Sequence, residues 1–514
     1  MKLVKISSDK IQIKTNDIEF QGVKINDLMS VSDGEVTLVT SVSQITDTDC
    51  EIADESMFDD YVPSLKVIEC DIIGSLQDGN YIKAIDRYPT TNVNVNLITD
   101  SDFKSMISKY ENGFKIGRYA NYNCDAYING NKFFQKHACI VGNTGSGKSE
   151  TVGNILEKVS NMKSANIIVF DIHGEYSGLS YARNISIGKD YQFPIWLLGF
   201  SDIVTNVLKI KEESATTIMT ALKKSFAVVT KGGNLQKPEY FSYYEFLSKL
   251  EDLNNEEVGT GEVYKSGAKA GQAKTTKGEY NGKLTGVINQ LQELKNDMRY
   301  WFMFEDKSET FIYRLIKDIF DNDKSVKNID LSAVPQDMVI PIISAITRII
   351  YDLQLVKENY TPVTMICDEA HLYIPNNFNL SASERRSVEI FEKIAKEGRK
   401  FGITLLVASQ RPSELNKTIM AQCGNFIVGK MNNENDKSMI KGLLAEGSES
   451  LIDTVTMFQP GNVLIIGDSF PIPLKVNVDL AEERPQSRTV EFWDIWNSER
   501  TDDIDKIYKR YNSK

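Results

Sequence analysis

"VGNTGSGKSE", residues 141–150, is the stretch that decides the fold. An apolar run at 138–141 leads into it, and residues 151–159 after it have helical spacing. From Gly142 to Ser149 the residues fit G-x-x-x-x-G-K-[ST], the pattern of a phosphate-binding P-loop between a strand and a helix. In such a loop the backbone N–H groups surround the phosphates, and the helix N-terminus adds partial positive charge. A chance turn would have to place both the lysine and the hydroxyl in register by coincidence.

The P-loop predicts that the protein uses ATP and Mg²⁺. Lys148 would reach the β- and γ-phosphates, and the hydroxyl of Ser149 would bind Mg²⁺. The residues expected to contact ATP in this loop are Gly142, Asn143, Thr144, Gly145, Ser146, Gly147, Lys148, Ser149 and Glu150.

A second motif, "PVTMICDEAHLYIP" at 362–375, places two acids directly after an apolar strand. Asp368 would hold the Mg²⁺ shell, and Glu369 would polarise the attacking water. The letters DEAH also occur in superfamily-two RNA helicases. We reject that interpretation, because the chain has neither a second arginine-rich helicase signature nor a second α/β domain.

A third stretch, "AKEGRKFGITLLVASQRPSEL" at 395–415, contains a buried strand at 403–408. This strand would bring Gln410 to the same sheet edge, where it can sense the γ-phosphate. Arg399 and Lys400 precede the strand on a turn, where they can face the nucleotide of a neighbouring subunit. The predicted catalytic residues are Lys148, Glu369, Arg399 and Gln410.

Apolar strand-like runs define the domain organisation. They recur at 138–142, 166–170, 363–367, 403–408 and 463–467, and helical segments separate them, which predicts a parallel α/β sheet of the RecA-like P-loop ATPase kind. We assign 116–199 and 331–480 to this core. Residues 1–115 alternate β-branched stretches and turns, including a hairpin at 64–86 closed by Asp78-Gly79, and predict a small β-barrel.

Residues 200–330 interrupt the core and predict a helical insertion. Within it, 255–283 has no periodicity and is rich in glycine, lysine and threonine, so we expect a mobile loop. Its five lysines can contact DNA phosphates, although a solvated insert explains them as well. They are Lys265, Lys269, Lys274, Lys277 and Lys283.

Composition limits the location and the partners. No signal peptide opens the chain, and the longest apolar run, 338–350, is broken by Ser344, Thr347 and Arg348, so we expect a soluble cytoplasmic protein without a membrane partner. Six cysteines, one of them Cys50, form no C-x-x-C pair. Cys139 and Cys367 lie inside predicted core strands, which indicates buried, reduced thiols of a cytosolic protein. The net charge of −12 argues against a surface coated for nucleic acid, but not against DNA in an enclosed channel.

Taken together, these motifs resemble the HerA/FtsK branch of P-loop ATPases, and HerA in particular. The resemblance rests on "QKHACIVGNTGSGKSE", "VFDIHGEYSGL" (169–179), "CDEAHLYIP", "KEGRKFGITLLVASQRPSEL" and "PGNVLIIGDSFPIPLKV" (460–476). It covers 114–180 and 330–496. It implies a homohexameric ring that moves double-stranded DNA through a central pore and works with a partner enzyme.

The resemblance also assigns roles to single residues. Arg399 matches the arginine that acts in trans, and Gln410 matches the sensor. Lys136 stands where the family usually has an arginine near the nucleotide, so it joins the expected ATP contacts, without the planar fork of a guanidinium. Residues 481–514 match a C-terminal segment that braces the adjacent subunit in such rings. Taken without the resemblance, the aromatic residues at 492–496 indicate core packing or a C-terminal docking helix.

Three histidines, His137, His173 and His371, all fall inside the motifs. One metal site for all three is implausible, because His137 precedes its strand and five residues of strand span about 17 Å. We expect His173 and His371 to orient Asp171, Glu175 or Glu369, with plain packing as the alternative.

The leading functional hypothesis is an ATP-driven hexameric DNA translocase. It would feed DNA to a partner effector, a nuclease or a sirtuin-like NADase, in antiviral defence or DNA end processing. One alternative is a ring scaffold that assembles and switches its effector, with ATP controlling its state. Another is a soluble relative of conjugative coupling ATPases, against which the missing membrane anchor argues.

Overall fold

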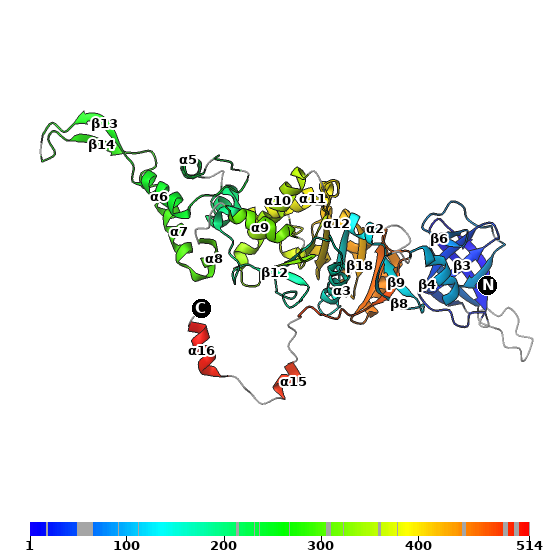
Figure 1. Cartoon of the computed structure of the whole chain (residues 1–514). Helices are drawn as coiled ribbons and strands as arrows, with labels where there is room; N and C mark the ends of the chain where they lie inside the picture. Colours follow the sequence, from blue (N-terminus) through cyan, green and yellow to red (C-terminus); the bar gives the residue numbers. More distant parts are fainter. Residues whose placement is uncertain are drawn as a thin grey trace, which may run out of the picture. The chain divides into compact units, whose positions relative to one another are not determined.

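A computed structural model describes most of the chain (Figure 1). It covers residues 1–16, 19–48, 65–90, 92–110, 113–211, 215–230, 232–235, 237–266, 268–304, 310–321, 323–357, 361–377, 379–444, 449–486, 492–497 and 503–512. Cys50 lies outside these ranges. The chain divides into two compact units: the first comprises Met1–Ile167, Asn359–Asn377 and Glu392–Arg484, and the second Ile168–Glu358, Phe378–Phe391 and Pro485–Lys514.

The first unit begins with a seven-stranded antiparallel sheet. Its strands are β1 (Lys2–Ile6), β2 (Lys10–Asn16), β3 (Leu28–Ser32), β4 (Thr37–Thr48), β5 (Leu65–Gln77), β6 (Asn80–Ile82) and β7 (Asn94–Leu97). Alternate residues such as Ile11 and Ile13 point into one hydrophobic core. Asp78 and Gly79 both have positive φ between β5 and β6, which confirms the predicted hairpin.

The closed barrel that the sequence suggested is not confirmed. The strand order is β1-β2-β5-β4-β3-β7, with β6 on β5, so β1 and β7 lie at opposite ends of the path. No ladder joins these two strands in the described part of the chain. Strand pairing among the described residues therefore does not close a barrel, because alternation along each strand specifies a buried face but not whether the two edges pair.

The first unit also contains the α/β core. Its strands run in the order β16 (Val363–Cys367), β17 (Ile403–Ser409), β10 (His137–Val141), β18 (Cys423–Val428), β19 (Asn462–Gly467), β20 (Leu474–Val478), β8 (Phe114–Tyr119) and β9 (Asp125–Ile128). The first four are parallel and the others pair antiparallel. All residues of β10, β16 and β17 are buried, as expected for parallel strands covered on both faces. Their carboxyl ends meet at one edge.

Helices connect and cover these strands. They are α1 (Asp100–Ile107), α2 (Gly130–Gln135), α3 (Lys148–Ser160), α11 (Ala382–Glu397), α12 (Lys417–Ala421), α13 (Glu434–Lys441) and α14 (Glu449–Asp453). The helix α3 starts at the P-loop lysine and buries Val152, Ile155 and Leu156 along one stripe. The predicted α/β P-loop ATPase fold is thus present.

The second unit has three neighbouring strands and the helical insertion. The strands lie in the order β12 (Ala182–Ser186), β15 (Val326–Asp330) and β11 (Ile167–Asp171). The helices are α4 (Phe200–Asp202), α5 (Thr216–Val229), α6 (Tyr243–Asn254), α7 (Thr285–Asn296), α8 (Trp301–Phe304), α9 (Phe311–Phe320), α10 (Gln336–Val356), α15 (Phe492–Trp496) and α16 (Ile504–Asn512). Phe492, Trp493 and Trp496 are exposed on α15, so they do not pack in the core of their own chain.

The stretch 255–283 corrects one expectation. In place of a loop without secondary structure, it forms an antiparallel hairpin of β13 (Glu257–Val263) and β14 (Ala273–Lys277). Every described residue of both strands except Lys274 is exposed. Because the hairpin buries neither face, its sequence has no alternation of apolar and polar residues, and periodicity could not reveal it.

Among the described residues, α10 is the one helix long and apolar enough to cross a membrane, and 67% of its most apolar window is buried inside the protein. Its Arg348 pairs with Asp202, which also accepts a hydrogen bond from Arg386 at 2.9 Å. Asp202 is 1% exposed and the two arginines about a quarter. The helix is therefore a core element tied to α4 and α11 by a buried ion cluster.

Asp202→Ala should destabilise the second unit by about 3 kcal/mol, because removing one partner of a buried ion cluster leaves two guanidinium groups without their carboxylate. Denaturant or thermal unfolding measures the loss. Asp252→Ala is the matched control: that carboxylate is exposed and pairs with Lys249 on the surface of α6, so its removal should change stability little. Equal effects of the two substitutions would contradict a buried cluster at Asp202.

Candidate nucleotide site

The P-loop follows β10 and ends where α3 begins at Lys148. Gly145 and Gly147 have φ angles of +75° and +94°, which side chains rarely adopt. A Cβ on Gly147 would also come within 2.9 Å of the backbone nitrogen of Gly461. The backbone itself therefore requires glycine at 147, the second glycine of the motif, and at 145, one of its variable positions.

Backbone hydrogen bonds from two other segments hold the loop. The N–H of Asn143 donates to Lys430 O at 2.8 Å, and the N–H of Gly461 donates to Ser146 O at 3.0 Å. Gly429 lies so close that its Cα is 3.2 Å from where a Cβ on Gly142 would stand. Neither Gly429 nor Gly461 was predicted as part of the site. The available signal in the sequence was that Gly429 directly follows a buried strand and Gly461 directly precedes one.

Lys148 forms an ion cluster with the two acids that follow β16. Its ammonium lies 2.6 Å from Asp368 Oδ1 and 3.0 Å from Glu369 Oε1, and the three side chains are 5%, 2% and 6% exposed. Burial by itself would lower the pKa of Lys148, but the two carboxylates raise it above its ordinary value. Burial would raise the pKa of Glu369, but Lys148 and Gln410 hold it below its ordinary value. Lysine and glutamate are both charged at neutral pH.

Gln410 joins the P-loop to this cluster. Its Nε2 donates to Glu369 Oε1 at 2.5 Å, and its Oε1 accepts a hydrogen bond from the hydroxyl of Thr144. Glu369 itself has a φ of +45°, a strained conformation for a residue with a side chain, and such strain is typical of functional sites. The predicted Gln410 thus lies at the same edge as the P-loop and both acids.

The predicted histidines behave differently from one another. His371 Nδ1 lies 3.3 Å from Glu369 Oε2 and 3.2 Å from Ser409 Oγ, and burial lowers its pKa although Glu369 acts to raise it. His173 is exposed. Backbone N–H groups of 174–176 orient Asp171 instead. Only His371 contacts an acid of the site.

The donor set fits a nucleotide with Mg²⁺. Ser149 is the second residue of α3, and Asp368 directly follows β16. A hydroxyl and a carboxylate, both oxygen ligands that Mg²⁺ prefers, therefore lie on the P-loop edge. Ser146 Oγ and Glu150 Oε2 are buried here without a hydrogen-bond partner. Mg²⁺ takes few protein ligands beside phosphate oxygens and water, so two suffice.

Comparison with known proteins shows which proteins this chain resembles. The family model "Helicase HerA, central domain" matches residues 114–350. A probable helicase of Methanocaldococcus jannaschii is 27% identical over 424 residues, covering 79% of this chain and 76% of that protein. The DNA double-strand break repair helicase HerA of Saccharolobus solfataricus is 26% identical, covering 80% and 77%.

This chain is a P-loop ATPase that is similar to the HerA helicases over most of its length. A solved structure, VirB4 of Thermoanaerobacter pseudethanolicus, aligns with a TM-score of 0.49 and 12% identity over 72% of this chain and 97% of that one.

Two predicted residues of this HerA-like ATPase lie at the opposite end of the core strands. Arg399 is exposed on the turn before β17 begins at Ile403, whereas Gln410 follows the same strand. Lys136 directly precedes β10 and pairs with Asp468. Five residues of strand span about 17 Å, so neither side chain lies with the P-loop of its own chain. The contact of Lys136 with ATP therefore stays a prediction, and in this geometry it would be made to the nucleotide of another subunit.

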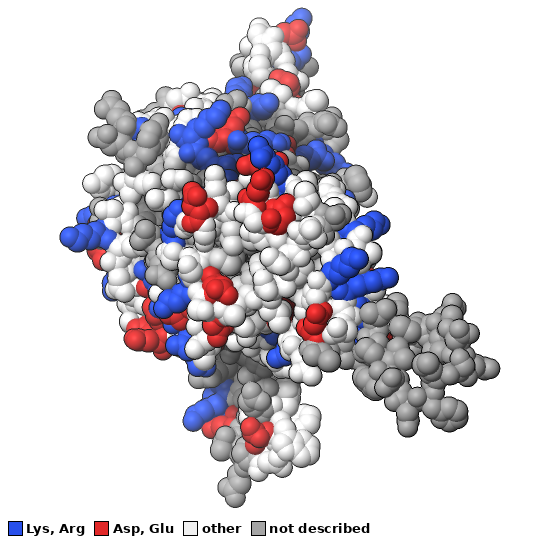
Figure 2. All heavy atoms as spheres, turned by 90° about the vertical axis from the view of Figure 1, so that its right-hand side faces the viewer, with Lys and Arg blue, Asp and Glu red and all other residues white. Residues whose placement is uncertain are grey.

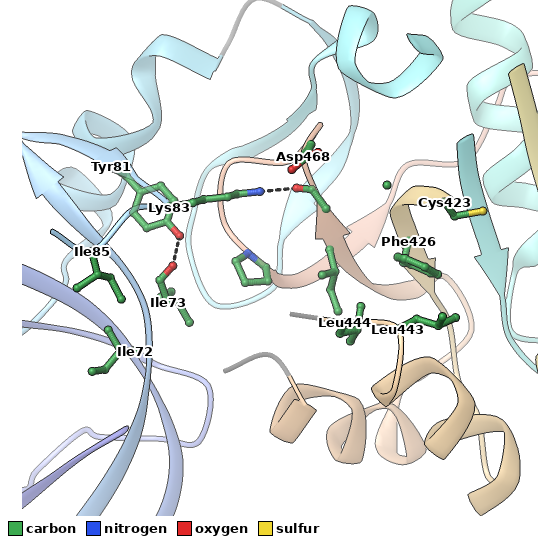
Figure 3. Close-up of a pocket in the computed structure, with 14 residues that line it drawn as sticks. Ile72, Ile73, Tyr81, Lys83, Ile85, Cys423, Phe426, Leu443, Leu444 and Asp468 are labelled. Atoms are coloured by element: carbon green, nitrogen blue, oxygen red, sulfur yellow. Dashed lines mark hydrogen bonds between the residues drawn. The ribbon is translucent and has the colours of Figure 1, made fainter. Parts of the chain in front are cut away.

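A cavity of about 380 Å³ opens beside Asp468 (Figure 3). Its walls are mostly apolar, and Lys83 points across it to donate a hydrogen bond to the backbone oxygen of Gly467 (Figure 3). Protein atoms crowd the Lys83 ammonium and lower its pKa to about 8, although much of the side chain is open to solvent. No lining residue belongs to the P-loop. The cavity is therefore separate from the nucleotide site of this HerA-like chain.

His137 fixes the start of β10. It is fully buried, and its ring bonds the carbonyl of Ala395 and the N–H of Leu405, each at 3.0 Å. Burial, with a smaller effect of Arg399, lowers its pKa to about 4. This histidine is thus a neutral connector between β10, α11 and β17.

Acid should weaken the folded protein through His137. Its folded pKa of about 4 lies below the value of about 6.5 in an unfolded chain, so the unfolded state binds the proton more tightly. The stability is complete above pH 6.5 and falls as the pH falls towards 4. From pH 7 to pH 5 the wild type should lose about 2 kcal/mol more than His137→Gln, measured by urea unfolding. His173→Gln, at an exposed histidine, is the control that should follow the wild type.

Proposed function

We propose that this HerA-like ATPase hydrolyses ATP to translocate along double-stranded DNA. The observation that carries the proposal is the buried cluster of Lys148, Asp368 and Glu369, closed by Gln410 against the P-loop. It supplies the parts that phosphoryl transfer to water requires: a phosphate cradle, a cation ligand and a base. The relatives that match most of the chain are DNA repair helicases, which supports DNA as the track.

Each residue has a role in this proposal. Residues 142–150 surround the phosphates, with Lys148 on the β- and γ-phosphates. Ser149 and Asp368 hold Mg²⁺, which neutralises phosphate charge when bound. Glu369 is ionised, so it can orient a water molecule and accept its proton. Gln410 touches both Glu369 and Thr144, and this pair of bonds lets it report the state of the γ-phosphate to the end of β17.

A ring of identical subunits completes the site. Arg399 is exposed at the edge of the core sheet opposite its own P-loop, so it can reach a nucleotide only on another copy of the chain. We therefore propose a homohexamer with Arg399, and Lys136 beside it, acting in trans. The exposed aromatic residues of α15 fit a C-terminal brace that packs on the neighbouring subunit.

The proposal extends to a partner effector, a nuclease or a sirtuin-like NADase, and to a role in antiviral defence or DNA end processing. Copurification from the native host tests the partner. The ring scaffold that only assembles this effector remains the alternative, and its distinguishing property is ATP turnover that ignores DNA.

Glu369→Gln should retain ATP binding but lower turnover by about 10²- to 10⁴-fold, because it removes the general base while keeping the size of the side chain. Wild-type turnover should rise on addition of duplex DNA, and the variant should stay inactive with and without it. A coupled phosphate-release assay and nucleotide-binding titrations measure both quantities. Lys148→Ala is the comparison variant, which should lose turnover through loss of its phosphate contact.

Two outcomes would contradict different parts of the proposal. Near wild-type turnover of Glu369→Gln would reject the active-site assignment. Normal turnover of the wild type that is indifferent to duplex DNA would leave the ATPase intact and reject translocation in favour of the scaffold.

Mixed rings test Arg399. Arg399→Ala should lower ATP turnover, since a trans arginine in this class contributes about 10³–10⁵ in rate, or less where another step limits the motor. Combined with Glu369→Ala subunits, it should regain part of the activity, because some interfaces then pair an intact Glu369 with an intact Arg399. Mixing inactive subunits at several ratios and measuring phosphate release checks this. Mixed rings that form but stay inactive at every ratio would show that Arg399 acts within its own subunit.

A further inference from the structure

The hairpin β13–β14 has a marked separation of charge along its length. Residues 264–278 contain four lysines and no acidic residue, whereas the acids of this segment, Glu256, Glu257, Glu262 and Glu279, lie on the strands and at the base. A chain of net charge −12 does not attract DNA with its surface as a whole. Figure 2 shows lysines, arginines and acids together on one face. Local basic elements such as this one must therefore provide contacts to a polyanion.

The base of the hairpin is anchored to α6 and α7 (Figure 1). The N–H of Gly278 donates to Glu256 O at 2.8 Å, the N–H of Gly282 donates to Asn254 O at 2.9 Å, and Asn254 Oδ1 accepts from Leu284 N at 2.8 Å. Tyr280 is buried beneath this junction. The arm thus leaves the helices from a fixed point, and its seven-residue strand β13 reaches about 20 Å beyond them.

The strands themselves have no packing role in the chain. Val258 and Val263 are 47% and 53% exposed. The acids are occupied within the hairpin: Glu262 pairs with Lys274 at 3.0 Å, and Glu257 accepts from the Thr275 hydroxyl at 2.6 Å. The charge of Lys274 is thus balanced by Glu262 on the stem, whereas the acid-free end of the arm carries positive charge.

The end of the arm presents two lysines. Lys265 and Lys269 are exposed, and neither has an ion-pair partner in the part of the chain that the structure describes. The ammonium of Lys269 lies 6.0 Å from the centre of the Tyr264 ring, at the outer range of a cation–π contact. The N–H of Gly271 donates to Tyr264 O at 2.9 Å and that of Gln272 donates to Lys269 O at 3.0 Å, so the backbone around these lysines is hydrogen-bonded.

We propose that Lys265 and Lys269 contact the phosphate backbone of DNA, with the hairpin as an arm that holds the track. Their ammonium groups are point charges without the planar fork that reads bases, so the contact is independent of sequence. The other residues at this end are mostly glycine, alanine and serine, which allow a close approach to the duplex. This inference rests on the proposed translocation along DNA.

The test compares two double variants that remove the same charge. Lys265→Gln/Lys269→Gln removes the proposed contacts. Lys249→Gln/Lys295→Gln removes two lysines of the supporting helices that have partners in the chain, Asp252 at 3.0 Å and the Tyr244 ring at 4.2 Å. Binding of the full-length protein to a 40-bp duplex is measured by fluorescence anisotropy from 50 to 200 mM KCl, and ATP turnover is measured with and without DNA.

Each lost phosphate contact should lower affinity about eightfold at 0.1 M salt and reduce the slope of log K against log salt by about 0.9, so the hairpin variant should lose about 1.8 in slope. The helix variant should match the wild type. Lys265→Arg/Lys269→Arg should restore binding, because charge and not shape is required. ATP turnover without DNA should be the same in all four proteins.

The outcomes separate this inference from the proposed function. A wild type that does not bind duplex DNA would reject the translocase itself. A wild type that binds, with an unchanged slope in the hairpin variant, would reject the arm alone. Equal losses in both double variants would show a general effect of net charge and would also reject it. Unchanged DNA binding with loss of a copurifying acidic protein would assign the arm to a protein partner instead.

Discussion

A buried lysine between two carboxylates is the interaction on which this site depends. Lys148, Asp368 and Glu369 are almost fully shielded from water, and each would cost several kcal/mol to bury alone. The cluster is stable only because β10 and β16 run in the same direction and end at one edge of the sheet. In the proposed reaction, phosphates and Mg²⁺ bring the opposite charges and take over these pairings. The same arrangement therefore balances the buried charges and places them where the nucleotide would bind.

The direction of the core strands also separates two groups of cations. Lys148 lies where the strands end, whereas Arg399 and Lys136 lie where they begin. No rotation of a side chain bridges that distance within one subunit. In the proposed ring, a site that uses both groups is built from two chains, and assembly is then a condition for turnover. His137, which links β10 to the neighbouring strand and helix, holds the second edge in place.

Charge in this molecule is arranged locally. The protein is acidic overall, yet the end of the hairpin whose base is fixed between α6 and α7 carries lysines and no acid. An acidic surface reduces unspecific adsorption to nucleic acid, and in the proposed arm a small basic element on a fixed base places the DNA contact at one position. The buried ion cluster at Asp202 follows the same rule inside the protein, where two arginines are tied to one carboxylate.

The sequence by itself determined the features that depend on neighbouring residues. The P-loop, the acids after β16, Gln410 after β17 and the Asp78-Gly79 turn could all be predicted, because strand ends, glycine angles and turn geometry are set within a few residues. Tertiary structure alone decided the contacts between distant segments: Gly461 against the P-loop, Thr144 on Gln410, the strand order of the first sheet and the place of Lys136. It also decided the hairpin, whose strands bury nothing and so leave no periodic signal. These features depend on how strands are ordered in space, and local pattern carries no information about that order.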